Sequence, residues 1–576
     1  MVDYHNEAQD AVVIEKEDAL RMHNQLGNDY DNVVKGAQAA ADYDHQDLGV
    51  VAAFRKHWKA ALWSIGLSTA LVMEGYDVVV INSFYGSNAF IDRFGTVLGN
   101  GEKVITAPWQ TGLSNSALVG EVFGLMLQGY ASDRWGYRPV YMASMAFMTA
   151  TIFMPVFAIS LPMLSAGEIL MGVPWGVFQS LTTTYAAEIC PIMLRPYMTS
   201  YVCFCWGLGI FLSSIVVRAT LNMEGQWAWR MPFALQWVWP IPLLLIAYFA
   251  PESPWHYVRK GRYEDAKASL RRMQTKSSGE DESHIENQVD FMKHTNALEI
   301  AEQAGASYRE CFRGTSTRRT LLVCVVYSLQ WWCGNPLMSY AVTFFRRAGL
   351  SQNNAFNLNI VMNTTYMIGT VTSWFLLRGM GRRTLYLLGA VLCCVHLIII
   401  GTLGCFESQA VSWATGAILI SFALFYNCTI GPGAYTIIAE IPSTRLLARS
   451  IGLARLTYVL TGLITNTLTP RMLSPDAWNW GARGAFLYLG TCGIILVILF
   501  FGLPESRNRT SAEMDELFAH GVPARQFAST EVSLYQANNH NSHSSTASSH
   551  LQADQEVKDE KNPADGVHIL TSDASQ

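Results

Sequence analysis

Two carboxylates stand in the first apolar segment of the chain. The stretch MEGYDVVVINSFYG, residues 73–86, places Glu74 and Asp77 three positions apart, and residues at that spacing share one face of a helix. A charged carboxylate in a bilayer costs about 3 kcal/mol or more, so it faces a watery cavity, finds a cation or stays protonated. Two interpretations follow: the pair bridges helices, or it binds and releases protons.

Two more ionisable residues lie within apolar stretches. Glu121 is embedded in SALVGEVFGL, and Arg455 stands in GLARLTYVL, within a late segment. Ionisable groups at such positions favour a functional role. Arg455 lies near the end of its segment, however, where a long basic side chain also reaches the membrane surface.

These side chains require elements that cross a membrane. Of 576 residues, 50% are hydrophobic and 15% are charged, and the charges crowd into the two ends and residues 251–319. Between the polar regions, windows of about 20 apolar residues recur, each long enough to cross roughly 30 Å of hydrocarbon as a helix. The twelve predicted spans are 59–83, 109–130, 139–159, 163–187, 198–219, 231–250, 320–344, 357–377, 384–404, 411–436, 447–469 and 484–503.

The spans divide the chain into five regions. These are a polar N-terminal tail at 1–57, a six-helix bundle at 58–250, a linker with short helices at 251–319, a second six-helix bundle at 320–503, and a C-terminal tail at 504–576. The last part of that tail, after about residue 530, is polar and of low complexity, so we expect disorder there.

Basic residues predict the orientation. Arg55, Lys56 and Lys59 precede span one, Arg134 follows span two, and a basic run at 259–272 follows span six. All fall on one side of the membrane, which is cytoplasmic by the positive-inside rule. Both termini are then cytosolic, as an even number of spans requires. The first sixty residues show no apolar core with a cleavage site, so we expect no removable signal peptide.

Short motifs recur in the same order in the two bundles, at nearly constant offset. The pairs are AAEICPIMLR at 186–195 with IAEIPSTRLL at 438–447, PESPWHYVRKGR at 251–262 with PESRNR at 504–509, and DRWGYR at 133–138 with RGMGRR at 378–383. A duplication of six spans predicts two bundles related by an axis along the membrane normal. A substrate path is then expected between them near the midplane.

These motifs resemble the sugar porter family of the major facilitator superfamily over roughly residues 55–525. PESRNRTSAEMDELF at 504–518 looks like the family ending PETKGRTLEEMDELF. EGYD in span one, PWGVFQSLTTTYAAE at 174–188 and GVPARQF at 521–527 look most like the fungal α-glucoside, maltose-type, proton symporters. The resemblance implies an all-α membrane protein with twelve transmembrane helices in two pseudo-symmetric six-helix bundles.

The resemblance also implies roles for the buried charges. In the α-glucoside symporters, an acid pair in span one, an acid in span two and an arginine in span eleven are associated with proton coupling. Glu74, Asp77, Glu121 and Arg455 match those positions.

Glu168 departs from a common pattern of proton-coupled sugar porters. Many of these carry an arginine at the start of span four that pairs with the span-one aspartate, and GEILMGVPWGVF places Glu168 there. If Glu168 faces Asp77, repulsion favours the protonated form of one carboxyl. Alternatively, Glu168 lies near the outer interface and has little effect.

Sugar recognition needs hydroxyl-matching amides and flat aromatic faces. SLQWWCGNPLMSY in span seven resembles the family's QQxxG start, with Gln330 in place, Trp331 replacing the second glutamine, and Asn335 one position early. Tyr435 stands at the tryptophan position of a GPxxW-like motif, and Asn466 fits another family amide. An aromatic here also fits plain lipid-facing packing. Span five, YVCFCWGLGIF, lacks the glutamines frequent in hexose carriers, which argues against ordinary glucose transport.

Charges at the cytoplasmic span ends form a predicted gate. In the resembling family, ion pairs there clamp the halves together when the site faces outwards, which supplies a two-state element for alternating access. The alternative is positive-inside anchoring alone. The candidate residues are Asp133, Arg134, Arg138, Glu188, Arg195, Glu440, Arg445 and Arg449.

No enzyme signature is found, since the chain shows no Walker loop, no metal-ligand spacing and no nucleophile with a partner. We therefore expect no cofactor, no metal and no nucleic-acid partner; the expected partners are a sugar, protons and the lipid bilayer. The predicted protein is a monomeric proton:sugar symporter of the plasma membrane that imports an α-glucoside such as maltose. The alternatives are a facilitative carrier, a carrier of another sugar or small polyol, and a transporter-like sugar sensor.

Overall fold

A computed structural model describes Val33, Lys35 and residues 54–99, 101–190, 194–223, 225–273, 282–303, 308–347, 349–406, 408–443, 446–507, 509 and 511–530. Residues 531–576, where we expect disorder, and most of the N-terminal tail lie outside these residues.

The described part of the N-terminal half consists of helices and one small hairpin, whose two strands have two residues each. Its elements are α4 (Trp58–Ser68), α5 (Leu71–Phe84), α6 (Asn88–Phe94), β1 (Thr96–Val97), β2 (Lys103–Val104), α7 (Ala107–Trp135), α8 (Tyr137–Thr151), α9 (Phe153–Val156), α10 (Leu161–Ile189), α11 (Arg195–Thr220), α12 (Trp227–Ala234), η2 (Leu235–Val238) and α13 (Pro240–Phe249). Strands β1 and β2 pair antiparallel.

The linker and the C-terminal half follow. Their elements are α14 (Pro254–Arg259), α15 (Tyr263–Met273), α16 (Glu282–Gln303), η4 (Glu310–Phe312), α17 (Gly314–Trp332), α18 (Asn335–Ser339), α19 (Ala341–Arg347), α20 (Gln352–Gly379), α21 (Arg382–Leu403), α22 (Gln409–Cys428), α23 (Ile430–Glu440), α24 (Leu447–Leu473), η6 (Gly481–Gly484), α25 (Ala485–Gly502) and α26 (Ser511–Ala519). At 22 residues, α16 is longer than the short linker helices expected.

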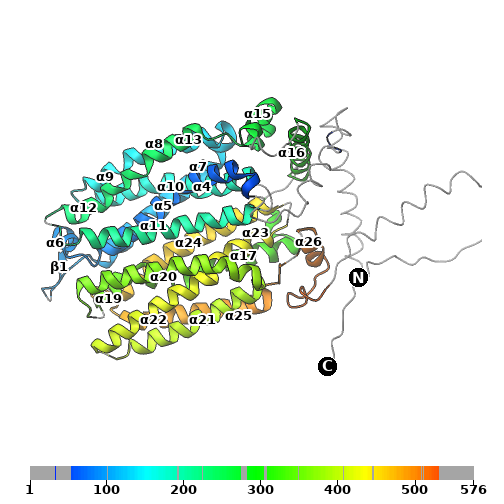
Figure 1. Cartoon of the computed structure of the whole chain (residues 1–576). Coiled ribbons are helices and arrows are strands. Elements are labelled where there is room, and N and C mark those ends of the chain that lie inside the picture. The colour runs from blue at the N-terminus through cyan, green and yellow to red at the C-terminus, as the bar shows by residue number, and fades with distance from the viewer. Residues whose placement is uncertain are drawn as a thin grey trace, which may run out of the picture.

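The two halves lie side by side with their long helices roughly parallel (Figure 1). The linker helices α15 and α16, together with α26, gather at one end of both halves, which we call the linker end. Helix α6 and strand β1 lie at the opposite end. The arrangement agrees with two bundles of six spans each.

Ten helical segments in the described part of the chain are long and apolar enough to cross a membrane. The two other predicted spans are present as helices α7 and α24, but they are less apolar. They carry Glu121 and Arg455, so their lower hydropathy has a local cause.

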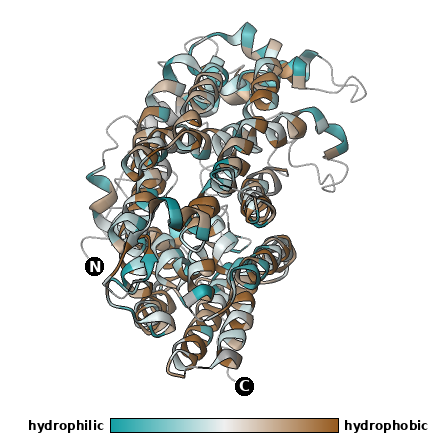
Figure 2. Cartoon of the chain, turned by 90° about the vertical axis from the view of Figure 1, so that its left-hand side faces the viewer, coloured by the Kyte–Doolittle hydropathy of each residue, from teal (hydrophilic) through white to brown (hydrophobic). Residues whose placement is uncertain are grey.

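Large apolar side chains cover the outside of the helices. Met126 and Phe375 are 74% and 73% exposed, and Ile494 and Phe501 are also well exposed. Viewed down the helix axes, the helices are mostly apolar, and polar residues gather in several of the connections (Figure 2). Such a surface is stable against lipid rather than water.

Helices α7 and α10 approach each other closely through glycines. A Cβ added at Gly120 or Gly124 falls 2.0 Å from a backbone oxygen of α10, and one added at Gly172 or Gly176 falls 2.2 Å from a backbone oxygen of α7. Only glycine permits this separation. These four glycines therefore set the separation of α7 and α10, and the contact fixes how Glu121 is presented to the interior.

The duplicated motifs form the same structure twice at the linker end. The Glu252 carboxylate accepts hydrogen bonds from the backbone N–H groups of Tyr137, at 2.8 Å, and Arg138, at 3.0 Å, at the start of α8. The Glu505 carboxylate likewise accepts from the N–H of Arg382, at 2.7 Å, at the start of α21. Burial raises the pKa of Glu252, although the backbone donors favour its charged form. Each copy thus caps a transmembrane helix across the bundle.

Candidate functional site

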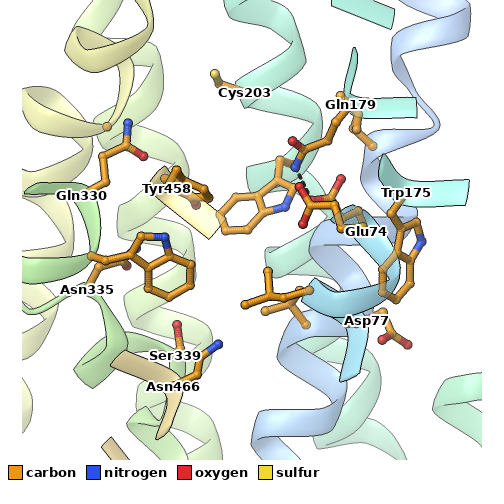
Figure 3. Close-up of a pocket in the computed structure, with 18 of the residues that line it drawn as sticks. Glu74, Asp77, Trp175, Gln179, Cys203, Gln330, Asn335, Ser339, Tyr458 and Asn466 are labelled. Atoms are coloured by element: carbon orange, nitrogen blue, oxygen red, sulfur yellow. Dashed lines mark hydrogen bonds between the residues drawn. The ribbon is translucent and has the colours of Figure 1, made fainter. Parts of the chain in front are cut away.

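A central cavity lies between the two halves, with an empty volume of about 1430 Å³ that includes its opening to solvent. Its walls come from α5, α7, α10 and α11 on one side and from α17, α18, α20, α22, α23 and α24 on the other. Figure 3 shows Glu74 and Asp77 on one wall, facing Gln330, Asn335 and Asn466 on the other. An acidic wall therefore faces a wall of amides and aromatic rings.

The acidic wall is built by helical spacing. On α5, Glu74, Asp77 and Ile81 follow the i, i+3, i+7 pattern and line the cavity together. On α10, Glu168 and Trp175 lie seven positions apart and share a face in the same way.

Glu121 and Arg455 form an ion pair across the halves. Arg455 Nη2 on α24 lies 2.5 Å from Glu121 Oε1 on α7, and the two side chains are 13% and 7% exposed. The Arg455 guanidinium also lies 4.7 Å from the ring centre of Tyr458. Arg455 therefore points inwards and is not a snorkelling residue, which settles the alternative raised by its position near a span end.

Glu74 belongs to the same charge cluster. It interacts electrostatically with both Glu121 and Arg455, and the side-chain amide of Gln179 donates a hydrogen bond to its carboxylate. The cluster thus contains two acids and one base. One of the two carboxylates therefore has no cation of its own within the cluster.

Asp77 lies in a separate environment. Its carboxyl lies within hydrogen-bonding reach of Glu168 and accepts a hydrogen bond from the side-chain amide of Gln236. Glu168 is 1% exposed and lines the cavity, so it lies on the Asp77 side of the interior rather than on the protein surface. Two unit charges about 4 Å apart repel by about 4 kcal/mol at an effective dielectric constant of about 20, so two carboxylates this close oppose each other.

The facing wall contains unsatisfied hydrogen-bond donors. Gln330 Nε2 and Trp331 Nε1, both on α17, are buried and have no hydrogen-bond partner among the described residues. Helix α17 breaks at Gly334, where φ is +99° and a Cβ would meet Leu397 at 2.7 Å, and the chain restarts at Asn335. Buried donors without partners at a cavity wall favour a bound polar ligand.

The other predicted sugar-binding residues also line this cavity. Tyr435 is 40% exposed and packs against the Tyr327 ring, and Asn466 lies on the same helix as Arg455 and Tyr458. All five candidates, Gln330, Trp331, Asn335, Tyr435 and Asn466, are therefore brought together, while their contact with a sugar stays a prediction.

The halves meet at the end opposite the linker. The rings of Tyr85 and Tyr340 stack with centroids 5.9 Å apart, and the Tyr340 hydroxyl donates to Ser114 Oγ at 2.8 Å. The Ala107 N–H, at the start of α7, donates to Asp476 Oδ2 of the other half at 2.9 Å. These contacts close the cavity at that end.

At the linker end, the ion pairs of Glu188 and Glu440 do not cross between the halves. Glu188 pairs with Arg259, while Glu440 pairs with Arg382 at 3.3 Å. Among the residues described, neither acid joins the two halves, so the predicted clamp is not formed in this conformation. The reason is geometric: the closing contacts between halves gather at the opposite end.

The remaining gate candidates have less defined roles. Asp133 and Arg134 are exposed at the end of α7, and Arg138 donates to the carbonyl of Tyr248. Arg449 is half-buried in the first turn of α24. Arg445 and the side chain of Arg195 lie outside the described part of the chain.

Sequence reasoning missed several residues that line or support the cavity. Gln179 holds Glu74, Gln236 holds Asp77, and Tyr458 lies between Arg455 and Trp331. The sequence offers a weak signal for Gln179 and Gln236, because a primary amide inside an apolar helix needs a hydrogen-bond partner.

Comparison with known proteins adds relatives along most of the chain. A family model described as "Sugar (and other) transporter" matches residues 63–518. A general alpha-glucoside permease of Saccharomyces cerevisiae is 39% identical over 521 residues, covering 88% of this chain and 84% of the relative. A maltose permease of the same yeast is 36% identical over 501 residues, covering 86% of this chain and 82% of the relative.

Solved structures share the fold. The proton:xylose symporter XylE bound to 6-bromo-6-deoxy-D-glucose superposes with a TM-score of 0.64 at 18% identity, covering 81% of this chain and 99% of that one. The inward open conformation of the xylose transporter XylE from E. coli gives a TM-score of 0.61 at 19% identity, with 79% and 99% covered.

Proposed function

The chain belongs to the sugar transporter family, and from this premise we propose that it imports an α-glucoside such as maltose together with protons. The observation that carries the proposal is the Glu121–Arg455 ion pair, which joins the halves at the wall of the central cavity. A change of protonation there alters both the charge of the cavity and a contact between the two halves. Proton binding and conformational change are thereby linked.

The chemistry of the two walls supports the substrate class. An α-glucoside offers hydroxyl groups to the amides of Gln330, Asn335 and Asn466 and apolar C–H faces to Trp331 and Tyr435. The yeast relatives carry the names of an alpha-glucoside and a maltose permease, which favours a disaccharide over a hexose.

The transport cycle is alternating access. With the cavity open outwards, the acids Glu74, Asp77 and Glu121 take up a proton and lose negative charge, and the sugar binds between the walls. The halves then close at the outer end through Tyr85 and Tyr340, and the cavity opens towards the cytosol. Each proton that moves inwards supplies about 2.3 kcal/mol per 100 mV of membrane potential.

The orientation follows from charge. Basic residues gather at the linker end, so we place this end and both termini in the cytosol. We further propose that the protein works as a monomer in the plasma membrane. The end with α6 and the hairpin then faces outwards.

Labelled maltose, glucose and sucrose, offered to cells without their own sugar transporters while the external pH is recorded, test the function. We expect maltose uptake with alkalinisation of the medium, and loss of both proton uptake and accumulation in Asp77→Asn and Glu121→Gln. Asp265→Asn, at an exposed acid of the linker helix α15, is the matched control and should behave as the wild type.

Each contrary result has a distinct meaning. Uptake that stops at the concentration equilibrium and ignores an uncoupler identifies a facilitative carrier. Accumulation that stays pH-dependent in both acid variants rules out their role in coupling. No uptake of any sugar, with protein at the cell surface, points to a sensor.

A further inference from the structure

Asp77 and Glu168 form a carboxyl pair between α5 and α10. Asp77 and Glu168 are each 1% exposed, and their carboxyl groups lie within hydrogen-bonding reach of each other. Gln236, which is fully buried, donates its side-chain amide to Asp77 Oδ1. The Asp77–Glu168 pair lines the central cavity at a different place from the Glu121–Arg455 ion pair.

A hydrogen bond between two carboxyl groups needs a proton. Two carboxylates offer acceptors only, so Asp77 and Glu168 can hydrogen-bond only when one of them is a carboxylic acid that donates. No cation among the described residues contributes to the environment of either group. Glu168 Oε1 is buried and receives no N–H or hydroxyl donor from the described chain. A negative charge on Glu168 is therefore unsupported.

The position of the proton follows from Gln236. Its amide N–H stabilises negative charge on Asp77, whereas nothing comparable reaches Glu168 Oε1. Gln236 Oε1 is also buried and accepts no hydrogen bond from the described residues. The hydrogen bond from Gln236 Nε2 to Asp77 is therefore the one that positions this amide. The acid of the pair is thus Glu168 and the acceptor is Asp77.

We propose that Glu168 keeps one proton throughout the transport cycle and donates it as a hydrogen bond to Asp77, while Asp77 takes up and releases the transported proton. On loading, a proton from the outer solution forms an O–H bond on Asp77. On release, that bond breaks towards the cytosol, and the O–H of Glu168 remains. Glu168 is therefore a positioning residue that tunes Asp77 and carries no transported proton itself. The inference rests on the proposed proton symport.

Among the described residues, the other titratable groups that face the pair are two phenols. Tyr76 lies near Asp77, and its hydroxyl donates to the carbonyl of Pro232 at 2.8 Å. Tyr85 lies near both acids, and its hydroxyl lies 3.2 Å from the Gln110 carbonyl and 3.0 Å from Ser114 Oγ. Both hydroxyls are occupied elsewhere. Glu74, Glu121 and Arg455 form the neighbouring cluster, so the pair must find its neutralising proton within itself.

Glu168→Gln and Glu168→Ala separate a retained proton from a transported one. The glutamine amide supplies the same donor without an ionisable group, so we expect an unchanged number of protons per sugar and an unchanged pH profile of uptake. The alanine variant removes the donor that stabilises the Asp77 carboxylate. Its pH profile should therefore move to higher pH by about one unit, with the number of protons per sugar unchanged.

The outcomes distinguish this inference from the proposed function. A wild type that moves no protons with sugar contradicts both. A wild type that moves protons, with fewer per sugar in Glu168→Gln, contradicts the retained proton alone. An alanine variant with the wild-type pH profile contradicts the tuning role.

Infrared spectroscopy gives an independent measurement if the alanine variant fails to reach the membrane. Purified wild-type protein at neutral pH should show a protonated-carboxyl absorption that decreases in Glu168→Gln. Identical absorption in the two proteins would show that Glu168 is ionised and would overturn the proposal.

Discussion

Arg455 Nη2 and Glu121 Oε1 meet 2.5 Å apart although the residues are 334 positions apart and lie in different halves of the protein. Both side chains are largely buried, and Glu74 joins them electrostatically. A contact of this kind is sensitive to any relative motion of the halves.

Replacing only one residue of this ion pair should destabilise the protein more than replacing both. Arg455→Gln leaves the charges of Glu121 and Glu74 buried without a cation, and we expect a loss of about 3 kcal/mol or more in unfolding free energy. The double variant Arg455→Gln with Glu121→Gln should regain most of that loss but stay unable to accumulate sugar. Thermal unfolding in detergent and uptake assays measure the two effects. A double variant as unstable as the single one would contradict this account.

Gln330 and Trp331 should govern sugar affinity. Replacing Gln330 by Leu removes one buried donor, which costs about 1 kcal/mol of binding and so raises the KM for maltose by about five-fold. Trp331→Phe removes the indole N–H and part of the ring, and we expect a similar increase. Trp332→Phe is the matched control, because Trp332 does not line the cavity. Equal KM values for Trp331→Phe and Trp332→Phe would remove Trp331 from the sugar site.

The α7–α10 contact should tolerate no added methyl group. A Cβ at Gly124 meets the Val173 carbonyl oxygen at 2.0 Å, so Gly124→Ala forces the helices apart at a cost of about 1–3 kcal/mol. Gly129→Ala, on the same helix with open space around the added Cβ, should be neutral or slightly stabilising. Unfolding temperatures of the two purified variants test this difference. Similar temperatures would show that the contact yields easily.

The hydrogen bond from the Ala107 N–H to Asp476 should hold the outer end closed. Asp476→Ala removes a charged acceptor at the start of α7, so we expect the outward-open population to increase about ten-fold. A cysteine introduced at Ser339, which lines the cavity, should then react faster with a membrane-impermeant thiol reagent added outside. Asp92→Ala, at an exposed acid of the same end, is the control. Unchanged labelling in Asp476→Ala would exclude this hydrogen bond as a latch.

Helical spacing made much of the site predictable. Glu74 and Asp77 were expected on one helix face, and they line the cavity together. The amides and aromatics of the facing wall were expected from motifs, and the structure brings them to the same cavity. The sequence does not predict that Glu74 bonds to Gln179 whereas Asp77 bonds to Gln236. Two residues on one helix face can still point to different neighbouring helices.

The sequence by itself determined the spans, their order and their duplication, because apolar length and repeated motifs are local properties of the chain. Only the tertiary structure decided which charge meets which partner: Glu121 with Arg455, and Asp77 with Glu168. Those pairings depend on how each helix is rotated and how closely glycines let neighbours approach. Neither quantity is set by residues adjacent in sequence, since both result from packing between distant helices.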